Sequence, residues 1–182
     1  GLVVPPAFMP TGPGRPRHLL PGRPLRVLFV GYVNLAKGFH VLAEACRTLG
    51  ADVALTVVGG RQLPPAYLRQ IAPDAEFTGH VAQAEVVRRM AAADVLVFPT
   101  LSDGFGLVQL EAMAQGLPVI ATNACGEVVR DGVDGFVFPA GDAEALVARL
   151  REKVTEILSA TPSAARSRAA FVISSTGVSR PR

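Results

Sequence analysis

Short apolar runs alternate with longer segments of helical spacing over most of this 182-residue chain. The runs are rich in β-branched residues, which is typical of strands that are buried on both faces of a parallel sheet. The segments between them repeat apolar residues at the three- and four-residue spacing of amphipathic helices. This alternation predicts an α/β fold, a Rossmann-like parallel six-stranded sheet with helices on both faces.

The pattern places the domain at residues 25–158. Seven prolines punctuate residues 1–24, which we interpret as an extended lead-in. Residues 159–182 are rich in Ser, Ala and Arg without periodicity, and we interpret them as a linker or disordered tail. Strands are expected at residues 25–31, 52–60, 75–81, 94–100, 118–122 and 135–138, and helices at residues 37–50, 64–72, 83–93, 107–116 and 126–132 and after an N-cap at Asp142.

The charges are distributed unevenly along the chain. The sequence pI is about 9.3, yet all 15 acidic residues lie between Glu44 and Glu156. Residues 31–156 hold 10 basic and 15 acidic side chains, and the other eight positive charges are arginines of the two ends. A nucleic-acid binder needs a basic face on its core. We therefore expect no nucleic-acid partner.

No apolar run approaches the roughly 20 residues that cross a bilayer. Without a charged and then apolar leader, we expect a cytoplasmic protein. The two cysteines, Cys46 and Cys125, are too far apart in sequence for a Cys-x-x-Cys zinc site or a disulfide framework. Cys125 precedes the expected helix at 126–132, where a thiol pKa can fall, or it is a small loop residue.

Glycine-rich segments follow several of the expected strands. Ligands of open parallel sheets bind at the carboxyl ends of the strands, where glycine lets the backbone approach closely. The helix that begins after Gly106 would direct free amides toward such a ligand, which suits a phosphate. The alternative is that these glycines only make turns. No Walker motif and no full G-x-G-x-x-G predicts ATP hydrolysis or nicotinamide binding.

Two carboxylates flank this helix start. Asp103 lies in the preceding loop, and Glu111 lies about one turn into the helix, roughly 8 Å along its axis. A carboxylate accepts two hydrogen bonds in a fork, which suits the vicinal hydroxyls of ribose or a hexose. The alternative for Glu111 is a solvated helix position, which is less favoured because Leu107, Leu110 and Ala114 share the helix's inner side.

Three stretches resemble the donor-binding domain of GT-B retaining glycosyltransferases of the family 4 type: "VLFVGYVNLAKGFHVLAEA", "ADVLVFPTLSDGFGLVQLEAMAQGLPVIAT" and "EVVRDGVDGFVFPAGDAEAL". The most specific motif is the pair of acids, separated by seven residues, around Gly-Phe-Gly. The resemblance implies transfer of a hexose from a nucleotide diphosphate sugar, which is the donor substrate, to an unknown acceptor. No Asp-x-Asp stands in the expected crevice loops, so we expect no metal and no further cofactor.

The resemblance also implies roles for the motif residues. Asp103 would contact hydroxyls of the transferred sugar, and Glu111 would hold the ribose. Backbone amides of Gly104, Phe105 and Gly106 would reach the sugar and the diphosphate.

The loop after the first strand begins at Gly31 and carries Lys37, whose positive charge would neutralise the diphosphate. Lys37 and the two acids, Asp103 and Glu111, form the expected catalytic set. His80 lies in the loop that the resemblance places near the nucleobase. The family often has an Arg directly after the first strand's Gly, whereas this chain has Tyr32, and Arg61 is the nearest alternative cation.

The resemblance covers only the second of the two domains of a GT-B enzyme. We therefore expect the chain to be part of a longer protein whose N-terminal domain holds the acceptor, with room for peripheral membrane association through that domain. Two alternatives remain at this point. One is a non-catalytic sugar-nucleotide-binding or partner module derived from such an enzyme, and the other is an epimerase of the same fold.

Overall fold

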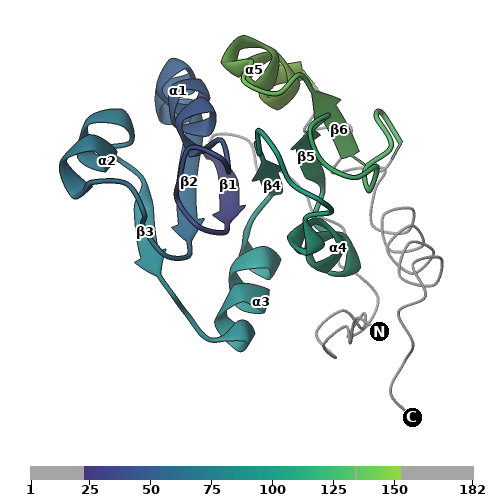
Figure 1. Ribbon diagram of the computed structural model, residues 1–182, viewed down its shortest axis with the longest axis horizontal. Coiled ribbons are helices and arrows are strands. Elements are labelled where there is room, and N and C mark those ends of the chain that lie inside the picture. Colours follow the sequence, from purple (N-terminus) through teal and green to yellow (C-terminus); the bar gives the residue numbers. More distant parts are fainter. Residues whose placement is uncertain (1–22, 134, 153–182) are drawn as a thin grey trace.

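The computed structural model describes residues 23–133 and 135–152, which form one sheet with helices on both faces (Figure 1). Most of the expected lead-in at 1–24 and all of the expected tail at 159–182 lie outside the described residues. None of the described helices combines the length and the apolar character that crossing a membrane requires.

The six strands are all parallel and lie in the order β3-β2-β1-β4-β5-β6. The strands are β1 (Leu25–Val30), β2 (Val53–Val58), β3 (Glu76–Gly79), β4 (Val95–Phe98), β5 (Val119–Thr122) and β6 (Gly135–Phe138). The helices are α1 (Phe39–Leu49), α2 (Pro65–Ile71), α3 (Gln83–Ala92), α4 (Leu107–Ala114) and α5 (Ala143–Glu152), and a short 3-10 turn, η2 (Gly50–Asp52), follows α1. The predicted fold class is confirmed.

Two apolar cores lie on the two faces of the sheet. Val27 and Phe29 of β1 pack in the core that α1, α2 and α5 cover, whereas Leu28 packs in the core that α3 and α4 cover (Figure 1). Successive side chains of a strand point to opposite faces. A strand between two helical layers therefore needs a continuous apolar run, which is the pattern in the sequence.

The loop after β5 departs from the prediction. Residues 126–132 form an irregular segment with bends instead of the expected helix. The backbone N–H of Val128 donates to the Gly126 carbonyl at 2.7 Å, and Val128 and Val129 are both buried. The end of the segment is bound to β6 instead: Asp131 forms a β-bridge with Gly135, and its Oδ1 accepts from the Val137 backbone N–H at 2.9 Å. Cys125 therefore precedes no helix, and burial raises the pKa of its thiol.

A buried carboxylate ties together the starts of β1 and β4. Asp94 is 2% exposed and accepts hydrogen bonds from the Arg23 guanidinium at 2.6 and 2.9 Å. Arg26 donates to it from the backbone at 2.8 Å and from the side chain at 3.0 Å. Burial opposes ionisation, but these hydrogen bonds outweigh it and lower the pKa of Asp94 to about 2. Asp94 and its two arginine partners thus link the start of β1 to the start of β4.

We expect Asp94→Asn to lower the free energy of unfolding by about 2 kcal/mol at pH 7. The pKa of Asp94 lies below its ordinary value of 3.8. Its contribution is therefore complete above the unfolded-state pKa and is lost as the pH falls from about 4 to about 2. Urea denaturation at pH 7 and pH 3 measures this, with the exposed Asp74→Asn as the matched control. An equal difference from wild type at both pH values would contradict the assignment.

Candidate functional site

The strand order reverses between β1 and β4, which are neighbours in the sheet although β2 and β3 separate them in sequence. The chain leaves β1 toward α1 on one face, and it leaves β4 toward α4 on the other (Figure 1). Ligands of doubly wound sheets bind where the loops part at such a point. The loops at 31–38 and 99–106 carry most of the predicted site residues.

The two loops touch at Gly38. Its φ is +66°, and a Cβ on this residue would collide with the carbonyl oxygen of Pro99. The backbone N–H of Leu101 donates to the Ala36 carbonyl at 2.8 Å, and the Thr100 hydroxyl donates to the same carbonyl at 3.2 Å. Only glycine allows both the left-handed turn and this close approach. The first loop is therefore held directly against the second.

An ion pair crosses between these loops. The backbone N–H of Lys37 donates to Asn34 Oδ1 at 2.8 Å, and Lys37 Nζ pairs with the carboxylate of Asp103. The two side chains are 31% and 18% exposed. Burial opposes ionisation of Asp103, but the hydrogen bond and charge of Lys37, helped by the Phe105 amide, lower its pKa. Two members of the expected catalytic set therefore face each other across the loops.

The Gly-Phe-Gly turn leads directly into α4. Gly106 caps the helix with φ +65°, and a Cβ there would lie 2.6 Å from the Phe98 ring and 2.7 Å from Gln109 Nε2. Among the described residues no side chain caps this helix, and its first turn holds no acidic residue. The Gln109 amide donates back to the Gly106 carbonyl at 2.9 Å, whereas among the described residues the amides of Leu107 and Val108 have no partner and are open to an anion.

Glu111 lies one turn into α4 and is half-buried. Burial raises the pKa of its carboxyl, against a long 3.4 Å hydrogen bond from Gln83 Nε2. Among the described residues Gln83 is its only partner, so most of its acceptor capacity is unused. Leu110 and Ala114 are buried as expected, whereas Leu107 is 38% exposed. Leu107 is the first residue of α4, where the side chain points back over the loop.

The structure brings His80 to the edge of the sheet where Gly31 begins the first loop. The His80 ring meets the half-exposed Tyr32 ring edge to face, with centroids 5.6 Å apart and planes at 75°. A Cβ on Gly60 would collide with this histidine. The backbone N–H of Gly31 donates to the Val58 carbonyl at 2.9 Å. The two rings form an aromatic surface at the β2–β3 end of the site.

Arg61, the alternative cation, lies over the ring of Phe77 on β3. Its guanidinium carbon is 6.0 Å from the centroid of the Phe77 ring. Tyr32 itself carries no charge. The cation that the structure pairs with Asp103 is therefore Lys37.

Three amide side chains that the sequence reasoning did not single out shape the site. Asn34 caps the backbone of the first loop, Gln83 reaches the carboxylate of Glu111, and Gln109 donates to the Phe105 carbonyl at 3.1 Å. An Asn three residues before a turning backbone is a recognisable capping signal. Gln109 gives a weaker signal, namely a polar residue at a buried position of an apolar helix.

The sequence of residues 24–156 matches a family model described as glycosyl transferases group 1. The amylovoran biosynthesis glycosyltransferase AmsK of Erwinia amylovora is 34% identical over 145 residues, which is 70% of this chain and 35% of AmsK. The phosphatidyl-myo-inositol mannosyltransferase of Mycobacterium leprae is 38% identical over 141 residues, 70% of this chain and 38% of that protein. The chain thus spans little more than a third of the length of these relatives.

Solved structures share the fold. Anabaena HepE, solved with UDP and glucose, matches with a TM-score of 0.71 and 25% identity over 82% of this chain and 44% of that one. The C-terminal domain of LpcC, a glycosyl transferase group 1 family protein of Francisella tularensis, matches with a TM-score of 0.67 and 20% identity over 81% and 85% of the two chains. The chain belongs to the group 1 glycosyltransferases, and its sheet is the C-terminal, Rossmann-like domain of a GT-B fold.

Proposed function

We propose that this domain binds the nucleotide diphosphate sugar donor of a retaining hexosyltransferase. The observation that carries the proposal is the Lys37–Asp103 ion pair across the strand-order reversal, beside the uncapped start of α4. This arrangement offers a cation and free amides to a diphosphate, and a carboxylate to sugar hydroxyls. The presence of UDP and glucose in the HepE structure supports this class of ligand.

The donor would lie along the carboxyl edge of the sheet. Asp103 accepts from hydroxyls of the transferred sugar, and the amides of the Gly-Phe-Gly turn and the first turn of α4 meet the diphosphate. Glu111 accepts both ribose hydroxyls in a fork, since its carboxylate has acceptor capacity to spare. The aromatic surface of His80 and Tyr32 is the place for the nucleobase.

Electrostatics then assist the chemical step. As the bond between the sugar C1 and the diphosphate oxygen breaks, negative charge grows on the leaving nucleoside diphosphate. Lys37 and the oriented amides stabilise that charge, and a well-placed donor of this kind contributes about 3 kcal/mol to lowering a barrier. We propose that these groups act without a divalent metal.

Donor binding requires an exchange of partners. In the free domain Lys37 and Asp103 neutralise each other, whereas in the complex Lys37 meets the diphosphate and Asp103 meets the sugar. We expect Asp103→Asn to bind a nucleoside diphosphate at least as well as wild type, because Lys37 is released. The same variant should lose most of the preference for the sugar-bearing nucleotide.

Calorimetry with paired ligands measures this, such as UDP against UDP-glucose and GDP against GDP-mannose. Asp74→Asn, an exposed aspartate far from the loops in sequence, is the matched control. An Asp103→Asn variant that keeps the full preference for the sugar-bearing ligand would show that Asp103 does not contact the sugar.

Removing the second carboxylate tests the ribose contact. We expect Glu111→Ala to weaken sugar-nucleotide binding by about 1.5–3 kcal/mol, the worth of hydrogen bonds to a charged group. Glu44→Ala, an exposed position on α1, is the matched control. Calorimetry in the presence of a chelator measures the affinity of each variant and shows whether binding needs a divalent metal. Unchanged affinity of Glu111→Ala, or an absolute need for magnesium, would count against the proposed site.

Catalysis also requires an acceptor held at near-attack distance. The described residues contain a donor site but no group that we assign to an acceptor, and the relatives are much longer proteins. We expect residues 1–182 alone to bind donor and transfer no sugar. Assaying this chain beside a version joined to an N-terminal GT-B domain measures this, and robust transfer by the shorter chain would refute it.

A non-catalytic sugar-nucleotide-binding module is the second candidate. It is favoured by the uncharged, half-exposed Tyr32 at the first loop, where related enzymes often place a second cation. The version joined to an N-terminal GT-B domain distinguishes the transferase from the binding module. If it binds donor but transfers no sugar to any acceptor, the result supports the module.

A further inference from the structure

A buried hydroxyl lies between the two loops of the candidate site. Thr100 follows β4 and is fully buried, although the strand before it is entirely apolar. Its Oγ1 lies 3.2 Å from the Ala36 carbonyl oxygen and 3.1 Å from the Ser102 carbonyl oxygen. Ala36 directly precedes Lys37, and Ser102 directly precedes Asp103. One side chain therefore contacts the residue before each member of the ion pair.

This hydroxyl is not needed merely to satisfy the two carbonyls. A threonine hydroxyl has one proton to donate, so the two bonds share it. The Ala36 carbonyl also accepts from the Leu101 backbone N–H at 2.8 Å, and it keeps that partner without the hydroxyl. Ser102 is an exposed residue. What the hydroxyl adds is a direct link between the two loops at a fixed separation.

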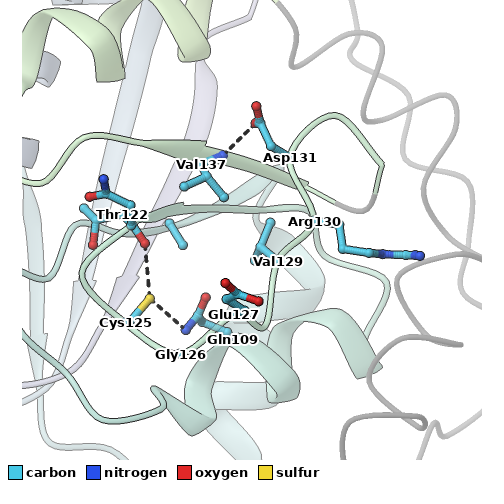
Figure 2. Close-up of a pocket in the computed structure, with 11 residues that line it drawn as sticks. Gln109, Thr122, Cys125, Gly126, Glu127, Val129, Arg130, Asp131 and Val137 are labelled. Carbon is cyan, nitrogen blue, oxygen red and sulfur yellow. Dashed lines mark hydrogen bonds between the residues drawn. The ribbon is translucent and has the colours of Figure 1, made fainter.

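The loop after β5 holds Thr100 from the other side. Thr122 is also buried, and its hydroxyl donates to the Thr100 carbonyl at 2.6 Å. Two residues farther on, the Ala124 carbonyl accepts from the Asp103 backbone N–H at 3.1 Å. Figure 2 shows the Cys125 thiol beside the Thr122 carbonyl, to which it donates at 3.3 Å. Thr100 and Asp103 are therefore both bound to one loop, which limits how far they can move apart.

The separation of Lys37 and Asp103 matters because one ligand has to meet both. In the donor complex proposed above, Lys37 contacts the diphosphate while Asp103 contacts the sugar that is bonded to it. The backbone position of each residue limits where its charged group can reach. A misplacement of about 1 Å between groups that act together can cost roughly a hundredfold in rate.

We propose that Thr100 is a positioning residue, whose hydroxyl sets the separation of Lys37 and Asp103 for a nucleotide sugar. Because Thr100 is fully buried, it acts through these two residues and not by contact with the ligand. The effect on the ion pair belongs to the free domain, whereas the effect on the nucleotide sugar rests on the proposed function. The two effects are measured separately.

The first experiment follows the Asp103 carboxyl of the free domain by a ¹³C nuclear magnetic resonance titration. Burial opposes ionisation, but Lys37 holds the pKa of this carboxyl below its ordinary value of 3.8. Thr100→Ser and Thr100→Ala both lose the methyl group and differ only in the hydroxyl. We expect Thr100→Ser to keep the low pKa and Thr100→Ala to raise it toward 3.8, because Lys37 is no longer held against the carboxylate.

Two further variants control this comparison. Thr100→Val keeps the shape of the side chain without the hydroxyl, and it should raise the pKa of Asp103 as Thr100→Ala does. Thr78 also directs its hydroxyl to two carbonyls, at 3.3 and 3.1 Å, and Thr78→Ala should leave the pKa of Asp103 unchanged. The backbone spectrum at each pH shows whether the domain is folded.

A Lys37→Ala background separates positioning from a general loosening of the loop. Without an ammonium group to place, the difference between Thr100→Ser and Thr100→Ala should disappear. The proposal is overturned if neither hydroxyl-free variant raises the pKa of Asp103, if Thr100→Ser raises it as much as they do, or if the difference persists in the Lys37→Ala background.

The second experiment measures donor binding by calorimetry with UDP-glucose and GDP-mannose. Thr100→Ala should bind the better of these ligands at least about tenfold more weakly than Thr100→Ser. In an Asp103→Asn background that difference should be lost, because effects that act through one contact are not additive. If wild type binds neither ligand, the proposed function is contradicted and the Asp103 titration alone decides the role of Thr100. If wild type binds and the two variants bind equally, the positioning role is overturned.

Discussion

The carbonyl oxygen of Pro99 lies against the Cα of Gly38, and the position of the site depends on this contact. It joins the loop after β1 to the loop after β4 where the strand order reverses. Because Gly38 is also the left-handed residue that begins α1, the same position directs the chain to one face of the sheet. Gly106 plays the corresponding part for α4 on the other face.

The Lys37–Asp103 pair follows from that contact. With the loops pressed together, a cation and a carboxylate that are far apart in sequence face each other. Partly exposed ion pairs contribute only about 0–1 kcal/mol, so opening this pair for the proposed donor would cost little. The strong pair of the fold, around buried Asp94, lies at the opposite ends of the same two strands. The stabilising ion pairs and the candidate site thus lie at opposite ends of β1 and β4.

The strands were predictable because a sheet covered on both faces demands continuous apolar runs, as in β4. The helix N-cap at Asp142 was also predictable, and its carboxylate does accept from the Ala145 amide at 2.8 Å. Residues 126–132 were assigned a helix wrongly, because contacts of Asp131 with β6, which no sequence pattern reveals, hold the segment in an irregular form. The hydrogen bonds of Thr100 with Ala36 and Thr122 could not be predicted, since they join three loops that only the fold brings together.

The structure of this domain with a bound nucleotide diphosphate sugar tests the central claim most directly. UDP-glucose and GDP-mannose are suitable probes. The account predicts the diphosphate at Lys37 Nζ and the first amides of α4, Asp103 turned from the lysine to a sugar hydroxyl, and the ribose diol on Glu111. A diphosphate bound away from α4, with the Lys37–Asp103 pair still closed, would contradict it.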